Sequence, residues 1–565
     1  MNSLFNFIVP SKSYGILAIC MLVFMHFLLP SLGGQGLELP NNLLILICLV
    51  TFIVVESWKI QNSQIIKFDS IAKLLILLTT ITFVISLWHG MSDIYPGVTG
   101  YLLLFTCFYI VLRQTETTPK FFFILLIFIS AAIEAVMGLL QMNGISVGIY
   151  ALELSGQAGV IAQGVFMQPN VFSSYMLAGF SAGLCLLFTA DWKLNKSIKF
   201  VIVLFNLLFV FLVLTSGSRT GWLSLILILL VFLIYLIQQK SWAKVIGILS
   251  FLLIPLTVLN FGVTEQVSVI DKVNTTIEKK VNSNFDHRKA IYRHTIDIIA
   301  EKPWLGYGFN NFIKEYRHQS ATKYHRKIAE GKDYPMPYFG NLQHPHNELL
   351  YFFFGVGILP VLIILLICTK VIRIIIKKDI DNTILPIVIA LPIAVHAMTE
   401  LPLSYSLAHS IILIFALVLL ANEEKQVDYS IHRVLSKFIF KPFSILLLLI
   451  TIVFSLNSYY TTMTLFVFLK DYPKNKEFIN YVFHPADNQD RYDFAIMSAT
   501  YALASEGGIK KAQVSYARWA LKEIQTKPRA GTYERLINCL ILLNRHKDAQ
   551  KVKMQAEFLF PTKIF

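Results

Sequence analysis

The chain has 565 residues, of which 55% are hydrophobic and only 15% are charged. A soluble globular protein usually carries about 25% charged residues, so the composition excludes that class. Apolar runs long enough to cross a hydrocarbon core of about 30 Å recur along the sequence. A membrane β-barrel would instead show short segments of alternating polarity. The sequence therefore predicts an all-α polytopic membrane protein.

About thirteen membrane-spanning helices are predicted from these runs. They begin near Tyr14, Asn42, Leu74, Val98, Phe121, Val171, Phe200, Trp222, Val245, Leu349, Ile384, Ser410 and Phe443. The first run ends in polar residues and is poorly equipped with a cleavage site. It is therefore interpreted as a span and not as a removed signal peptide.

Lysine and arginine set the predicted orientation, because short cytoplasmic loops are enriched in them. With the N-terminus inside, the basic clusters at 59–73, 113–120, 193–199, 240–244, 370–378 and 425–441 all fall on the inner side. The C-terminus then lies outside. The net charge of +15 follows mainly from this topology, and it indicates contact with anionic membrane lipids and does not imply nucleic acid.

The expected setting is the inner membrane of a bacterium, with the outer side facing the periplasm, because no eukaryotic targeting signal is evident. Five of the six cysteines lie in predicted spans, and Cys539 is alone in the C-terminal tail. No disulfide framework is therefore predicted.

Composition divides the chain into four regions. A bundle of about nine spans (1–263) is followed by a large outer loop (264–346), about four further spans (347–464) and a polar helical outer domain (465–565). We expect the loop to carry parts of the active site, because its last residues are the polar ones considered below.

Two helical parts are predicted outside the membrane. In the loop, Asp286 is expected to cap a helix that runs to Ala300, and a short segment follows from Asn311 to Tyr316. In the tail, helical periods cover 491–505, 510–525, 531–543 and 546–558. These form two helical hairpins similar to a pair of tetratricopeptide repeats, which either brace the neighbouring domain or recognise a partner protein.

Polar residues gather where the outer loop meets the next apolar run, at His344, His346, Asn347 and Glu348. Such groups are costly at a membrane boundary unless they are used or paired. A histidine can accept the proton of a hydroxyl nucleophile near neutral pH, and Asn347 could orient that imidazole or bind a leaving oxygen. The alternative is an interfacial histidine bonded to a backbone carbonyl. Two imidazoles without further spaced ligands do not predict a zinc site.

Two arginines are candidates for binding phosphate groups. Arg219 lies in SGSRTGW, a short outer turn between two spans, and Arg288 shares one face of its predicted helix with Tyr292. A guanidinium offers a fork of donors that suits phosphate or pyrophosphate. The alternatives are snorkelling to the lipid headgroups for Arg219 and a solvated loop position for Arg288.

Further polar groups occur at other outer turns and within spans. Glu400 could orient His346 or be a plain loop carboxylate. Gln168 and Asn170 could bind sugar hydroxyls or cap a helix, and the cap is favoured slightly. His26 and Glu134 lie within spans, where they mark either a substrate path or a paired structural site.

Together these motifs resemble the O-antigen ligase and polymerase-like superfamily of membrane glycosyltransferases. The shared pattern is His346-Asn347 before a span, glycines about nine residues on at 355 and 357, a basic residue in a short outer turn, and PxxGxG at 303–308. Within the superfamily, QHPHNE, TELPLSY, QPN and the outer tail look most like the bacterial protein O-oligosaccharyltransferases of the PglL type.

The resemblance implies the transfer, with inversion, of a glycan from undecaprenyl pyrophosphate at the periplasmic face, without ATP, a metal or another cofactor. The acceptor would be a Ser or Thr hydroxyl of an exported protein such as a pilin. In ligase relatives the acceptor is a lipid A-core sugar, and in polymerase relatives it is another glycan. A lipid-linked glycan transporter is the non-enzyme alternative, although the internal repeats usual in transporters are not seen.

The resulting expectation assigns catalysis to His346 as general base, with Asn347 and Glu400 beside it. Substrate binding is assigned to Arg219 and Arg288, which would hold the pyrophosphate, and to Gln168, Asn170, His344 and Tyr292.

Overall fold

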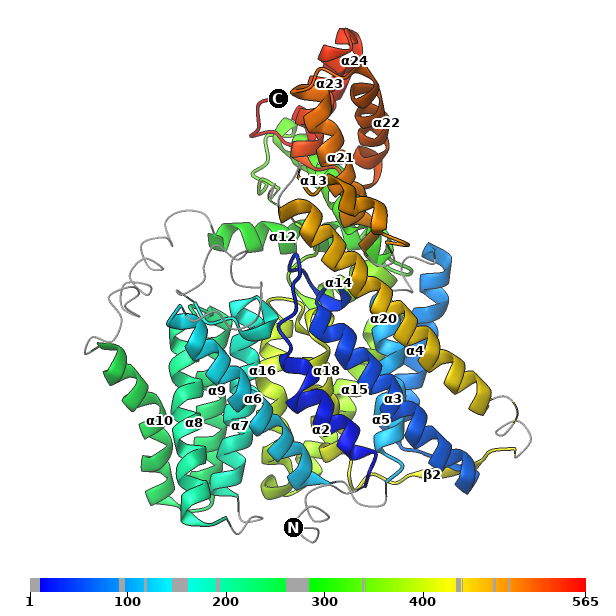
Figure 1. Cartoon of the computed structure of the whole chain (residues 1–565). Helices are drawn as coiled ribbons and strands as arrows, with labels where there is room; N and C mark the ends of the chain where they lie inside the picture. Colours follow the sequence, from blue (N-terminus) through cyan, green and yellow to red (C-terminus); the bar gives the residue numbers. More distant parts are fainter. Residues whose placement is uncertain are drawn as a thin grey trace. The chain divides into compact units, whose positions relative to one another are not determined.

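The computed structural model describes residues 11–90, 97–115, 119–144, 161–189, 194–260, 284–337, 340, 342–432, 438, 440–470, 474–485 and 488–565. Within these ranges almost all regular structure is helical (Figure 1). The strands described there are one antiparallel pair, β1 (Ile65–Phe68) and β2 (Val427–Ser430). The predicted all-α membrane class is therefore confirmed.

The helices of the described ranges include nine that are long and apolar enough to cross a membrane. They are α3 (Pro40–Ser63), α4 (Ser70–His89), α6 (Lys120–Met142), α7 (Pro169–Phe188), α8 (Lys196–Thr215), α9 (Arg219–Gln238), α15 (Ile358–Lys377), α16 (Ile380–Ala397) and α20 (Lys441–Lys470). Shorter apolar helices are α2 (Tyr14–Leu22), α5 (Val98–Leu112), α10 (Trp242–Asn260) and α18 (Leu407–Leu420). All the predicted spans except the one expected from Leu349 begin within a few residues of one of these helices. The number of helices that cross the membrane and their orientation stay predictions.

The span predicted to begin near Leu349 differs from the structure. The apolar run is divided into a short helix, α14 (Glu348–Val356), and the membrane-length helix α15, which begins at Ile358. Gly357 separates them with φ +74°, a conformation that only glycine adopts at little cost. The prediction was wrong at this point because both sides of the break are equally apolar.

The chain forms two compact units. Unit 1 comprises residues within 1–80, 100–278 and 363–463, and unit 2 comprises residues within 81–99, 279–362 and 464–565. Of the predicted site residues, Gln168, Asn170, Arg219 and Glu400 belong to unit 1. Arg288, Tyr292, His344, His346 and Asn347 belong to unit 2.

In unit 1, α7 is the central helix, and it packs against α6, α8, α9 and α16 (Figure 1). All its side chains from Val171 to Leu186 are buried. Small residues permit this packing, because Gly179 meets Ala131 and Gly183 meets Asn206 too closely for a Cβ atom to fit. The close packing fixes where the first turn of α7 lies among the neighbouring turns.

In unit 2, the outer loop forms α12 (Asn284–Ile299) and α13 (Phe312–Ala329). Since α12 begins at Asn284, the predicted cap residue Asp286 lies inside the helix, and the capping prediction was wrong. The segment predicted to end at Tyr316 continues to Ala329, because the buried rings of Phe312 and Tyr316 anchor α13 in a cluster shared with α12 and α14.

The tail contains the four helices that the sequence predicted: α21 (Gln489–Ser505), α22 (Lys510–Thr526), α23 (Ala530–Leu542) and α24 (His546–Leu559). Each packs on the next, around a core that includes Tyr516, Tyr533 and Leu536. Helix α13 packs against α22 and α24, and His325 Nε2 donates a hydrogen bond to the Phe558 carbonyl at 2.9 Å. The tail and the outer loop therefore share one compact unit.

Candidate active site

The PxxGxG turn and the helix that follows the His-Asn motif lie against each other in unit 2. The PxxGxG turn pairs with the end of α14: Tyr307 N–H donates to the Phe354 carbonyl at 2.8 Å, and Gly308 N–H donates to the Gly355 carbonyl at 2.9 Å. After the break at Gly357, Ile358 N–H donates to the Pro303 carbonyl at 2.8 Å. The loop thereby fixes α14, which carries the His-Asn motif at its start.

The glycines of both motifs are required by this contact. Gly306 has φ +68°, and a Cβ there would lie 2.5 Å from the Phe354 carbonyl oxygen. A Cβ at Gly355 would overlap the ring of Phe309, and one at Gly357 would overlap the Trp304 carbonyl. Any side chain at these positions would push the loop away from α14.

His346 has an unusual backbone. Its φ is +54°, in the left-handed region that only a few per cent of non-glycine residues occupy, histidine being among the more frequent with asparagine and aspartate. Tyr292 Oη donates a hydrogen bond to the His346 carbonyl at 3.0 Å, and His346 N–H donates to His344 Nδ1 at 3.2 Å. A strained residue of this kind costs about 1–3 kcal/mol and persists only where its surroundings hold it.

The two histidines differ in environment. His344 is buried, with 6% of its surface exposed, whereas His346 is half-buried. Their rings meet edge to face with centroids 4.7 Å apart. Because His344 Nδ1 accepts the His346 N–H, that nitrogen carries no proton. His344 therefore supports the backbone, and the His346 imidazole is the more accessible of the two.

Asn347 begins α14 as its N-cap. Its Oδ1 accepts a hydrogen bond from Leu350 N–H at 2.9 Å, and the side chain is buried. This cap satisfies one of the free N–H groups of the first helical turn. Asn347 thus has a structural task that the sequence analysis did not foresee, and the catalytic role expected for it stays a prediction.

Helix α12 packs against α13 and α14 and carries Arg288 and Tyr292, both half-buried. It also carries His294, which was not predicted as a site residue from the sequence. His294 is buried between the rings of Tyr316 and Tyr334, and its Nε2 donates to the Pro335 carbonyl at 2.9 Å. Burial lowers the pKa of His294 from 6.5 to about 4, so this imidazole is neutral at physiological pH.

In unit 1, Arg219 is the first residue of α9 and is exposed. The hydroxyl of Ser218 before it accepts the Gly221 N–H at 3.0 Å and caps the helix. Across the described ranges, no hydrogen bond or ion pair involves the Arg219 guanidinium. It is therefore free to bind an anion.

Glu400 lies on a neighbouring turn. It is buried, follows the end of α16, and its N–H donates to the His396 carbonyl at 2.9 Å. The hydroxyl of Thr399, which precedes Glu400, is hydrogen-bonded at 3.0 Å to the hydroxyl of Thr220, which follows Arg219. The structure thus places the turn that carries Arg219 beside the turn that carries Glu400.

The QPN segment lies at the same end of unit 1. Ser173, in the first turns of α7, donates a hydrogen bond to the Ser216 hydroxyl at 2.8 Å, next to the turn that carries Arg219. Gln168 occupies the N-cap position, but its side chain makes no capping bond, so the favoured capping interpretation was wrong. Its Oε1 is buried without a partner among the described residues, while Asn170 is half-buried.

A buried hydrogen-bond network joins the helices α7, α16 and α18 close to these turns. The Ser174 hydroxyl contacts His396 Nδ1 at 2.8 Å and His409 Nε2 at 3.0 Å, and it joins α7, α16 and α18. All three side chains are at most 2% exposed. His409 was not predicted from the sequence, although a histidine in the apolar helix LAHSIILIF is a signal of a buried polar contact.

The choice left open for the span residues His26 and Glu134 is resolved by their contacts. His26 Nδ1 lies 2.6 Å from Glu134 Oε1, and Glu134 Oε2 accepts the Val165 N–H at 3.1 Å. The Gln141 side chain also donates to the Gly164 carbonyl and accepts a hydrogen bond from the Gly164 N–H. The paired structural role is therefore the one observed, and it fixes the segment that leads to Gln168.

Comparisons with known proteins find two matching family models and one curated relative. A family model described as "O-Antigen ligase" matches residues 204–365, and one described as "Virulence factor membrane-bound polymerase, C-terminal" matches residues 385–565. The chain is also similar to an O-antigen ligase of Salmonella typhimurium, with 27% identity over 193 residues. That match spans 33% of this chain and 44% of the relative, less than half of its length.

Proposed function

The chain belongs to the O-antigen ligase and polymerase-like superfamily of membrane proteins, and on this premise we propose that it transfers a lipid-linked glycan to a hydroxyl acceptor, with His346 as general base. The observation that carries the assignment is the half-buried imidazole on a left-handed backbone, braced by Tyr292 and His344. Strain of this kind is concentrated at functional sites. The proposed setting is a bacterial inner membrane with the site at its periplasmic face.

In the proposed reaction, an imidazole nitrogen of His346 takes the proton of the acceptor hydroxyl while the hydroxyl oxygen attacks the anomeric carbon of the glycan. A bond from the anomeric carbon to the acceptor oxygen forms. The bond from that carbon to the pyrophosphate oxygen breaks with inversion, and the electron pair leaves with undecaprenyl pyrophosphate. His346 then releases the proton to solvent. A general base typically contributes about 10²–10⁴-fold to such a rate.

The leaving pyrophosphate gains negative charge, and the proposal assigns its stabilisation to arginine. Arg219 is exposed and has no protein partner among the described residues, and Arg288 supplies a second guanidinium. Fixed positive charge where negative charge develops is usually the largest catalytic term. The scheme assigns no step to a metal. Glu400 is proposed to balance the positive charge of the imidazolium, and the amides of Gln168 and Asn170 to bind sugar hydroxyls.

The acceptor we propose is a Ser or Thr hydroxyl of an exported protein such as a pilin. The support is that the four-helix tail packs on α13 in the same compact unit as His346, because helical hairpins of this kind commonly bind proteins. The second candidate is transfer to a lipid A-core sugar, which the similarity to an O-antigen ligase favours.

Glycan analysis of cells with and without the gene separates these acceptors. Loss of glycan from exported proteins alone supports protein transfer, and loss from lipopolysaccharide alone supports the ligase. Purified protein reconstituted with lipid-linked glycan and acceptor tests transfer itself. Covalent glycan on the acceptor excludes a pure transporter.

A further inference from the structure

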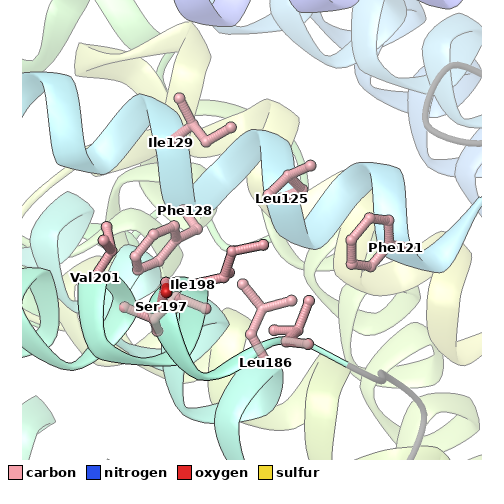
Figure 2. Close-up of a pocket in the computed structure, with 10 residues that line it drawn as sticks. Phe121, Leu125, Phe128, Ile129, Leu186, Ser197, Ile198 and Val201 are labelled. Carbon is pink, nitrogen blue, oxygen red and sulfur yellow. The ribbon is translucent and has the colours of Figure 1, made fainter. Parts of the chain in front are cut away.

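An apolar groove runs between α6 and α8 in unit 1, away from the turns that carry Arg219 and Glu400. Figure 2 shows Phe121, Leu125, Phe128 and Ile129 of α6 facing residues of α8 across it. The other lining residues are Leu186, Leu194, Ser197, Ile198, Val201 and Ile202. The groove has a volume of about 270 Å³, and Ser197 is the one lining residue with a polar side chain. Such a surface suits hydrocarbon.

The rim of the groove is open to the surroundings. Ile129, Ile198 and Val201 are 36%, 46% and 47% exposed, although all lie on helices of membrane length. Exposed aliphatic side chains on such helices face lipid chains. A single chain can therefore enter the groove sideways from the bilayer.

Lysines begin both of the helices that line the groove. Phe121 and Ser197 directly follow Lys120 and Lys196, the first residues of α6 and α8, and Lys199 comes one turn later. Lys196 and Lys199 are exposed, and in the parts of the chain that the structure describes, none of the three lysines has an ion pair. The positive ends of two helix dipoles add to this charge.

We propose that the groove is a binding site for an anionic phospholipid, with one acyl chain between α6 and α8 and the phosphate group at Lys196 and Lys199. The apolar lining accounts for the chain, and the uncompensated lysines at the start of the helices account for the anionic headgroup. Lysine stems of this length can hold a headgroup while their methylenes cover the apolar rim. This site requires no glycan transfer, so it stands apart from the proposed function.

Binding is measured by native mass spectrometry of the full chain, stripped of lipid in detergent and titrated with dioleoyl phosphatidylglycerol or dioleoyl phosphatidylcholine. The protein should retain phosphatidylglycerol at the lower concentration. The pair Lys196→Glu and Lys199→Glu should weaken its binding about tenfold or more, since each lysine near a headgroup contributes appreciably. Phosphatidylcholine binding should change little.

Matched controls separate the groove from general charge. Arg373→Glu with Lys377→Glu reverses two exposed basic residues on α15 and should leave phosphatidylglycerol binding unchanged. Ile198→Trp fills the groove from an exposed position and should weaken binding, whereas Ile226→Trp, at an exposed position on α9, should not.

Two results would overturn the proposal: equal retention of both lipids, or equal loss in the groove variants and their controls. Retention of a copurifying polyprenyl phosphate in preference to phosphatidylglycerol, recognised by its mass, would overturn it as well. The readout is lipid binding, so it stands or falls independently of whether glycan transfer is detected.

Discussion

Replacing Tyr292 with phenylalanine tests whether the backbone of His346 is held for catalysis. Tyr292→Phe keeps the ring and removes the hydroxyl that donates to the His346 carbonyl at 3.0 Å. Such a hydrogen bond contributes about 0.5–1.5 kcal/mol net, while the left-handed conformation of His346 costs about 1–3 kcal/mol. The two energies are of similar size, so the loss should let His346 leave its native conformation in part of the population.

The expected result is a fall of about 3–10-fold in the initial rate of glycan transfer. This is smaller than the loss expected for removing the imidazole itself, about 10²–10⁴-fold. The rate is measured with purified protein, lipid-linked glycan and acceptor, and thermal melting is followed in parallel.

Tyr334→Phe is the matched control, because the Tyr334 hydroxyl donates to Asp297 in the same unit and makes no contact with His346. It should lower the melting temperature of the protein without lowering the transfer rate of the folded fraction. If Tyr292→Phe slows transfer no more than Tyr334→Phe does, the bracing of His346 has no catalytic role and the reasoning is refuted.

Three further predictions concern other contacts. Arg219→Ala should lower transfer by about 10²-fold, and Arg219→Lys should restore only part of it, because a lysine keeps the charge without the fork of donors; equal rates in all three proteins would contradict pyrophosphate binding. Thr399→Val removes the hydrogen bond to Thr220 at nearly constant shape and should lower transfer about fivefold while the melting temperature changes by only a few degrees; an unchanged rate would show that the two turns act independently. Burial lowers the pKa of His294 to about 4, so the unfolded chain takes up a proton at this residue below about pH 6.5 while the folded protein does not. The free energy of unfolding should therefore fall by up to about 3 kcal/mol between pH 6.5 and pH 4. Thermal melting at pH 7.5 and pH 5 measures this fall, and His294→Gln should remove this part of the pH dependence.

The membrane helices could be predicted from sequence because a bilayer requires long apolar runs whatever the tertiary structure. The tail helices could be predicted for a related reason, since polar breaks such as Gly507-Gly508 separate clear helical periods. The break after α14 could not, because it depends on a hydrogen bond from Ile358 to Pro303, far away in the sequence. Helix α13 was predicted too short because most of its residues are polar, and its buried rings, Phe312 and Tyr316, lie in its first turns.

The sequence could predict which residues belong to the candidate site, but not which contacts those residues make with one another. His346 was preferred to His344 from the resemblance, and its greater exposure is consistent with that choice. The left-handed backbone of His346, the cap formed by Asn347 and the buried contact between Ser174 and His409 all depend on tertiary geometry. No spacing in the sequence encodes them.

The most direct test of the central claim compares wild-type protein with His346→Ala and His346→Gly in the reconstituted transfer reaction, with covalent glycan on the acceptor detected by mass spectrometry. Wild type should modify the acceptor, and both variants should lose about 10²–10⁴-fold in rate. His346→Gly should also melt at or above the wild-type temperature, because glycine adopts φ +54° without strain. Full transfer by either variant would contradict the role of His346 as general base.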